Sequence, residues 1–259
     1  MRVGEIGCYL SEKGAEARNS RIRSLSARYT ESVAVSLSEK FPKLKANHIS
    51  WLGFAATLGG SVINAYTDKN GFAGFFQIAG SLADALDGPV ARSGGGSKNG
   101  DLNDVAADKS GEAAVFWGHA KSAETKLGRF AALAALSTCI LPSLIRATAE
   151  STGYYVPEDG GSKLALLGTR AGRCILGIAG TLSPKLQPLT DSISAASNIY
   201  ACFGRIKGMK KIDNPESDLK DIGIKKLPIL AAGVALTGAL ALHMAKSENK
   251  NYGFGAPLG

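Results

Sequence analysis

Four aspartates lie close together in the chain at two regular spacings. Asp84 and Asp87 are three residues apart, and Asp104 and Asp108 are four residues apart. On a helix, either spacing places both side chains on one face. A short glycine-rich link between the pairs can turn one helix back against the other and bring the carboxylates together. Like charges at such a distance need cations, and hard oxygen ligands favour Mg²⁺, Mn²⁺ or Ca²⁺.

The residues around the aspartates add a phosphate-binding character. Gly88 follows Asp87 and lets a ligand approach the backbone closely, and Arg92 is placed to meet a phosphate. Metal, phosphate and a carboxylate that removes a hydroxyl proton together indicate phosphoryl transfer. Two alternatives are solvated loop carboxylates and a calcium loop in 101–112, although that stretch lacks the alternating ligands of an EF-hand.

The segments that must position these side chains are long and apolar. Hydrophobic residues make up 45% of the 259 and charged residues 20%, which are near the averages of soluble proteins. The charges, however, crowd into 1–48 and 205–226 and leave apolar segments of about the bilayer-spanning length, roughly 20 residues. These segments are 49–67, 72–92, 104–121, 129–148, 164–183, 187–206 and 227–245. The pattern indicates an all-α membrane protein.

The N-terminal region predicts a helix on the membrane surface. In 18–41, apolar residues recur at steps of three or four while basic residues occupy other faces, and Pro42 ends the pattern. A cytoplasmic N-terminus would place most Lys and Arg residues inside. A net charge of +8 suits an anionic membrane, whereas the aromatic platforms of nucleic-acid binding are missing. No nucleic-acid partner is expected.

One alternative fold is a soluble, basic helical bundle. The segment 187–206 is a weak membrane span because it contains Asp191 and several Ser and Asn residues. The four cysteines have no metal-binding spacing and are interpreted as buried small apolar residues.

Eight residues form one longer pattern with fixed local spacing. It reads Asp84-x-x-Asp87-Gly88-x-x-Ala91-Arg92, then Gly100-x-x-x-Asp104-x-x-x-Asp108. This pattern resembles the signature of the CDP-alcohol phosphotransferases, also called CDP-alcohol phosphatidyltransferases, which are membrane enzymes that make phospholipids. The resemblance covers roughly 18–207 and includes KANHISWLGF and PSLIRATAESTG.

The resemblance implies a fold and a location. Members have an amphipathic juxtamembrane helix and six transmembrane helices, form homodimers in the cell membrane, and open their active site to the cytoplasm. We therefore expect an N-terminal segment at 1–47 and a six-helix transmembrane domain at 48–207. A basic cytoplasmic linker at 208–226 and an extra transmembrane helix with a short tail at 227–259 would follow.

The resemblance also implies a reaction in which an alcohol attacks the β-phosphorus of a CDP-lipid, such as CDP-diacylglycerol, and releases CMP. Asp84, Asp87 and Asp104 would hold Mg²⁺ or Mn²⁺, and Asp108 would complete the metal site and act as the base. The residues expected to border the CDP group are Gly88, Ala91, Arg92 and Gly100.

The acceptor is sought among basic residues of the later helices. Arg170 and Arg173 are three residues apart and can clamp a phosphate, and Arg146 can supply a third charge. A comparable basic pair is found in the phosphatidylinositol-phosphate synthases of this family, although Gly168 and Thr169 depart from their pattern. We expect a phosphorylated polyol, inositol phosphate before glycerol phosphate. The alternatives are a phosphatidylglycerophosphate synthase, a non-catalytic cation-binding membrane protein, or arginines that merely flank a membrane span.

Overall fold

The computed structural model describes residues 21–41, 43–95, 100–156 and 170–211, and within these ranges the protein is almost entirely helical. The helices are α2 (Arg21–Lys40), α3 (Ala46–Tyr66), α4 (Asn70–Val90), α5 (Gly100–Ser122), α6 (Lys126–Thr138), α7 (Leu141–Ser151), α8 (Arg170–Leu182) and α9 (Gln187–Lys207). A π-helical turn, η1 (Ala91–Gly95), continues α4. Two short strands, β1 (Tyr154–Tyr155) and β2 (Lys210–Lys211), pair antiparallel. The prediction of an all-α fold is confirmed.

Several predicted segments fall wholly or partly outside the described residues. These are the start of the surface helix at 18–20, the start of the fifth span at 164–169, nearly all of the linker, and the extra helix at 227–245. The structure does not test the helices and the linker predicted for these segments, so they stay predictions.

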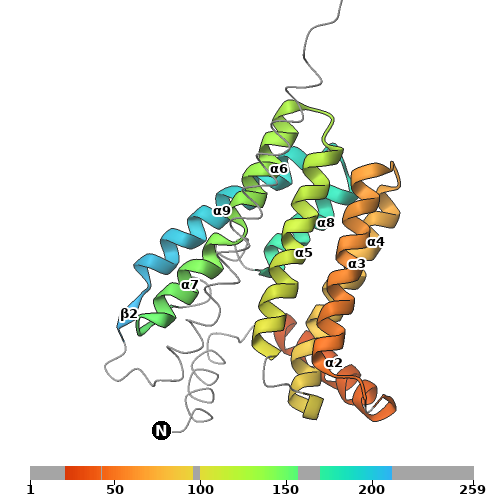
Figure 1. Cartoon of the computed structure of the whole chain (residues 1–259), viewed down its shortest axis with the longest axis vertical. Coiled ribbons are helices and arrows are strands. Elements are labelled where there is room, and N and C mark those ends of the chain that lie inside the picture. Colours follow the sequence, from red (N-terminus) through yellow and green to blue (C-terminus); the bar gives the residue numbers. More distant parts are fainter. Residues whose placement is uncertain (1–20, 42, 96–99, 157–169, 212–259) are drawn as a thin grey trace, which may run out of the picture.

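The bundle is organised around α3, which packs along both α4 and α5 (Figure 1). Helix α8 contacts α4 and α5, while α9 packs along α6, α7 and α8. Helix α2 packs against α4 and η1, near the end of the bundle where α4 finishes and α5 begins. The two aspartate-bearing helix ends therefore lie beside a common helix.

The segment predicted as one span at 129–148 is two helices, α6 and α7, with Cys139 and Ile140 between them. Pro142 accounts for the break, because proline lacks a backbone N–H and its ring clashes with the carbonyl four residues earlier. Taken together, Lys126–Ser151 is the one stretch in the described part of the chain that is long and apolar enough to cross a membrane.

Glycines let α3 and α4 approach closely. A Cβ atom on Gly80 would lie 2.6 Å from the Gly53 carbonyl oxygen and would also collide with the Thr57 hydroxyl. A Cβ atom on Gly60 would lie 2.6 Å from the Ala73 carbonyl oxygen. Both contacts are with the facing helix, so these glycines set the separation between the two helices.

We expect Gly80→Ala to destabilise the protein by about 1–3 kcal/mol, because the added methyl group overpacks the α3–α4 contact. Gly59→Ala is the matched control, since a Cβ atom there has no atom within 4 Å. That change should be neutral or stabilise by up to about 1 kcal/mol through helix propensity. Thermal unfolding of the purified protein compares the two; equal melting temperatures would contradict close packing at Gly80.

Several large apolar side chains lie on the surface of the bundle, while several polar side chains are buried inside it. Phe75, Leu82 and Phe130 are each at least 61% exposed, whereas Gln77 and Asn198 are at most 1% exposed. Exposed apolar side chains around a core of small and polar residues are what a lipid environment favours.

Candidate active site

Three of the predicted aspartates form one carboxylate cluster. Asp84 comes from the last part of α4, and Asp104 and Asp108 come from the first turns of α5. One oxygen from each lies within 4.8 Å of the other two, and all three side chains are partly buried. Oxygens on opposite sides of a bound Mg²⁺ or Ca²⁺ are about 4 to 5 Å apart. The cluster therefore fits a divalent cation.

Asp87 is held differently from these three. Its Oδ2 accepts a hydrogen bond of 2.7 Å from the hydroxyl of Ser50 on α3, and the residue is only 8% exposed. Asp87 is not part of the three-residue cluster, although it lies one turn from Asp84. Its role as a metal ligand stays a prediction.

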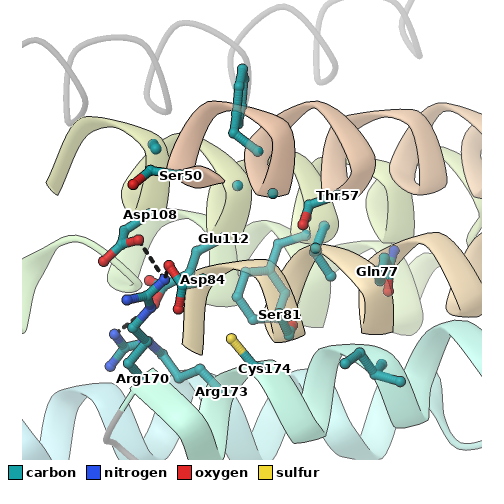
Figure 2. A pocket seen from close by; sticks show the side chains of 18 residues that line it. Ser50, Thr57, Gln77, Ser81, Asp84, Asp108, Glu112, Arg170, Arg173 and Cys174 are labelled. Atoms are coloured by element: carbon teal, nitrogen blue, oxygen red, sulfur yellow. Dashed lines mark hydrogen bonds and ion pairs between the residues drawn. The ribbon is translucent and has the colours of Figure 1, made fainter. Parts of the chain in front are cut away.

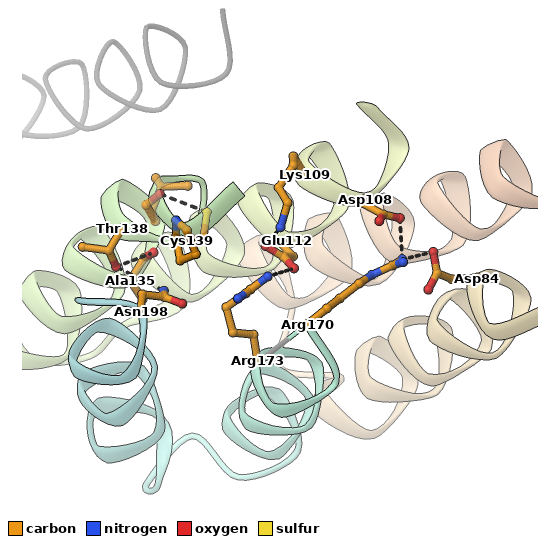
Figure 3. Close-up of polar contacts among 12 residues, drawn as sticks. Asp84, Asp108, Lys109, Glu112, Ala135, Thr138, Cys139, Arg170, Arg173 and Asn198 are labelled. Carbon is orange, nitrogen blue, oxygen red and sulfur yellow. Dashed lines mark hydrogen bonds and ion pairs between the residues drawn. The ribbon is translucent and has the colours of Figure 1, made fainter. Parts of the chain in front are cut away.

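Arg170 supplies positive charge to the cluster. Its guanidinium forms ion pairs with both Asp84 and Asp108, and the arginine reaches between the two carboxylates from the first turn of α8 (Figures 2 and 3). The side chain of Arg170 retains 34% exposure. The guanidinium of Arg170 thus lies where two predicted metal ligands, Asp84 and Asp108, converge.

Arg173 forms a separate buried ion pair next to the cluster. Its Nη2 donates to Glu112 Oε1 at 2.8 Å, and Lys109 Nζ donates to Glu112 Oε2 at 2.9 Å (Figure 3). The side chains of Arg173 and Glu112 are 4% and 5% exposed. The structure thus gives the two predicted phosphate-binding arginines different partners.

Arg146 lies on α7 and forms an ion pair of 2.7 Å with Glu150 on the same helix. It does not line the pocket that contains Asp84, Asp108, Arg170 and Arg173. Its predicted contact with an acceptor phosphate stays a prediction.

The residues predicted to border CDP lie where α4 ends, with Gly100 at the start of α5. A Cβ atom on Gly88 would meet only the tip of the Arg92 side chain, at 3.5 Å, so the backbone there is open to a ligand. Ala91 begins the π-helical turn that carries Arg92. Arg92 is largely exposed, and its guanidinium lies 3.9 Å from a carboxylate oxygen of Glu31 on α2. The surface helix therefore borders the predicted nucleotide side.

The cluster opens into a pocket between α3, α4, α5 and α8 (Figure 2). Its lining combines the charged residues Asp84, Asp108, Glu112, Arg170 and Arg173 with uncharged residues that include Thr57, Gln77, Val115 and Ile178. Carboxylates can hold a cation or take a proton, and a guanidinium can bind a phosphate, so the arrangement suits phosphoryl transfer.

Two groups were missed by reasoning from the sequence. Glu112 continues the four-residue spacing of Asp104 and Asp108, a signal that could have identified it. His119 and Asp191 appear in sequence only as isolated polar residues, yet His119 Nδ1 lies 2.8 Å from Asp191 Oδ1 and both residues are fully buried.

This pair belongs to a polar network that joins four helices. His119 Nε2 lies 2.8 Å from Thr181 Oγ1, and the Thr181 hydroxyl donates to Gln77 Oε1 at 2.8 Å. Gln187 Nε2 donates to the His119 carbonyl oxygen at 2.9 Å. His119 lies in the last turn of α5, far along the helix from Asp104 and Asp108, so the network joins the helices away from the carboxylate cluster.

A helical bundle with this cluster and pocket has the features of a metal-dependent phosphotransferase. The family model for CDP-alcohol phosphatidyltransferase matches residues 44–196, and the chain belongs to that family. It is an enzyme of phospholipid biosynthesis that transfers a phosphatidyl group from a CDP-lipid to an alcohol. The family is embedded in membranes and depends on divalent metal.

Solved structures of phosphatidylinositol phosphate synthase from Mycobacterium tuberculosis are similar to this chain. The structure with CDP-DAG bound has a TM-score of 0.58 and 25% identity, and the match covers 70% of this chain and 93% of that one. The structure with manganese and citrate has a TM-score of 0.54 and 24% identity, with coverage of 69% and 88%. No curated protein sequence matches the chain.

Proposed function

We propose that this enzyme transfers the phosphatidyl group of CDP-diacylglycerol to inositol phosphate. The observation that carries the proposal is the position of Arg170, a partly exposed guanidinium beside the carboxylates of Asp84 and Asp108. A charged acceptor phosphate would find its partner there, next to a base, whereas a neutral alcohol would not use the guanidinium. The similarity to a phosphatidylinositol phosphate synthase supports the same acceptor.

In the proposed reaction, Asp84, Asp104 and Asp108 would hold the divalent metal, with Asp87 as a further ligand. Mg²⁺ or Mn²⁺ bound there would neutralise negative charge on the pyrophosphate. Gly88, Ala91, Arg92 and Gly100 border the CDP group.

Asp108 removes the proton from the acceptor hydroxyl as its oxygen forms a bond to the β-phosphorus. The bond from the β-phosphorus to the bridging oxygen breaks, and CMP leaves with the bonding electrons. Arg170 holds the acceptor phosphate so that the hydroxyl faces Asp108. Holding the reacting groups in this orientation lowers the entropic part of the activation barrier.

A panel of acceptors tests the substrate assignment directly. Purified protein is incubated with CDP-diacylglycerol, Mg²⁺ and one of inositol phosphate, glycerol phosphate, free inositol or serine, and CMP is measured. We expect inositol phosphate to give the highest kcat/KM. Preference for glycerol phosphate would make the enzyme a phosphatidylglycerophosphate synthase, and preference for an unphosphorylated alcohol would remove the role of Arg170.

Replacing Arg170 with Gln should raise the KM for the phosphorylated acceptor by about tenfold or more, while the KM for CDP-diacylglycerol changes little. Arg170→Lys should rescue only partly, because an ammonium keeps the charge but loses the two-pronged geometry. Lys185→Gln, at an exposed basic residue beyond the other end of α8, is the control and should leave both KM values unchanged. An unchanged acceptor KM in Arg170→Gln would contradict phosphate binding by this residue.

We also propose a placement in the cell membrane as a homodimer, with the carboxylate cluster facing the cytoplasm. The exposed apolar side chains of α4 and α6 support contact with lipid, and α2 would lie at the cytoplasmic surface. The catalytic unit would be 48–207, with 1–47 before it, and the basic linker 208–226 and an extra transmembrane helix in 227–259 after it. Accessibility of introduced cysteines from each side of oriented vesicles would test this topology.

A further inference from the structure

Glu112 is the least exposed of the carboxylates that line the pocket, and it has two cationic partners. One oxygen accepts from Arg173 at 2.8 Å and the other from Lys109 at 2.9 Å. All three residues are at most 9% exposed. Charged groups are held in such surroundings only when they are paired, and removing one partner leaves the other uncompensated.

The two ion pairs between α5 and α8 are spaced about one helical turn apart on both helices. Asp108 and Glu112 are four residues apart on one face of α5, and Arg170 and Arg173 are three apart on α8. Arg170 pairs with Asp108 and Arg173 with Glu112, so successive turns of the two helices meet (Figure 3). The inner pair is buried and the outer pair lies at the carboxylate cluster.

We propose that Glu112 is a positioning residue that holds α8 against α5 through Arg173 and thereby aims Arg170 at the reacting groups. This inference rests on the proposed function, in which Arg170 binds the acceptor phosphate. It assigns the two arginines different tasks: Arg170 contacts the acceptor, and Arg173 acts through the position of the helix that carries both.

Exposure and partners support this division. The side chain of Arg173 is 4% exposed and its Nη2 is engaged by Glu112, whereas the side chain of Arg170 is 34% exposed. Loss of the Glu112 charge would remove the carboxylate that Lys109 and Arg173 share. Because Arg173 would lose this contact to α5, the first turn of α8 would shift. A small displacement at the reacting groups is enough to reduce catalysis strongly.

The test compares Glu112→Gln with Asp191→Asn in the full-length protein. Each change removes one buried carboxylate that pairs with a buried basic side chain. Glu112 pairs with Arg173 next to the cluster, whereas Asp191 pairs with His119, far along α5 from the cluster. We expect both variants to melt at lower temperature. Only Glu112→Gln should raise the KM for inositol phosphate, by about tenfold, with little change in the KM for CDP-diacylglycerol.

A conservative variant keeps the test decisive if Glu112→Gln does not fold. Glu112→Asp retains the charge on a shorter side chain, so we expect its acceptor KM to lie between those of the parent and Glu112→Gln. If Glu112→Asp lowers the melting temperature and leaves the acceptor KM at the parent value, the carboxylate has only a structural role and the inference fails.

A double-mutant comparison separates positioning from direct contact. If Arg173 acts only through Glu112, the double variant Glu112→Gln/Arg173→Gln should have about the same acceptor KM as either single variant. A further rise in KM that multiplies the two single effects would mean that Arg173 binds the acceptor itself, which overturns the inference. A parent enzyme that uses only unphosphorylated alcohols would instead refute the proposed function and, with it, this inference, whereas failure of the Glu112 variants alone would leave the proposed function standing.

Discussion

Asp108→Asn will reduce the rate of CMP release by at least about a hundredfold, the effect expected when a general base is removed. Asparagine has nearly the same size as aspartate and keeps one oxygen that can bind a metal, but its amide does not take a proton from the acceptor hydroxyl. In the structure Asp108 lies in the carboxylate cluster and pairs with Arg170, so it borders both the predicted metal position and the predicted acceptor phosphate.

The measurement follows CMP at saturating CDP-diacylglycerol and acceptor, so that kcat is compared rather than binding. Mn²⁺ binding to the variant is measured separately by electron paramagnetic resonance, because Asp108 is also a predicted ligand. Asp68→Asn, at an exposed aspartate between α3 and α4, is the control and should leave kcat unchanged. Turnover of Asp108→Asn close to that of the parent would remove Asp108 from the mechanism.

Chelation of divalent metal will abolish CMP release, and adding Mg²⁺ or Mn²⁺ in excess of the chelator will restore it. The carboxylates of Asp84, Asp104 and Asp108 converge within 4.8 Å, a separation that suits oxygen ligands of one ion. Without the metal, the negative charge of the bound pyrophosphate would meet these carboxylates directly and be repelled.

Recovery should be complete, because Arg170 pairs with Asp84 and Asp108 and can offset their mutual repulsion while no metal is bound. The melting temperature in chelator should therefore fall only modestly, a second readout that does not depend on activity. Asp84→Asn should weaken Mn²⁺ binding, whereas Asp68→Asn should not. Full activity in chelator would contradict a metal site at this cluster.

The sequence by itself determined which residues are expected to carry the chemistry. The spacings of Asp84 and Asp87, and of Asp104 and Asp108, are fixed by the helical repeat, which is a local property of the chain. The same reasoning placed the apolar helices, and the signature that includes Gly88 and Arg92 led to the correct enzyme family. The break between α6 and α7, inside the span predicted at 129–148, also follows from a local feature, Pro142.

Only the tertiary structure decided which partners these residues take. Asp87 accepts from Ser50 on α3, while Asp84 joins the carboxylates of α5. His119 and Asp191 are 72 residues apart in sequence but form one buried pair.

The partners of the two arginines of α8 were likewise decided only by the tertiary structure. Their spacing predicted a shared phosphate, which stays a prediction; in the structure Arg170 pairs with Asp84 and Asp108, and Arg173 pairs with Glu112. The helical repeat fixes which side chains share a face of one helix. Which faces meet depends on the close packing of helices far apart in the chain, and that packing is a property of the whole bundle.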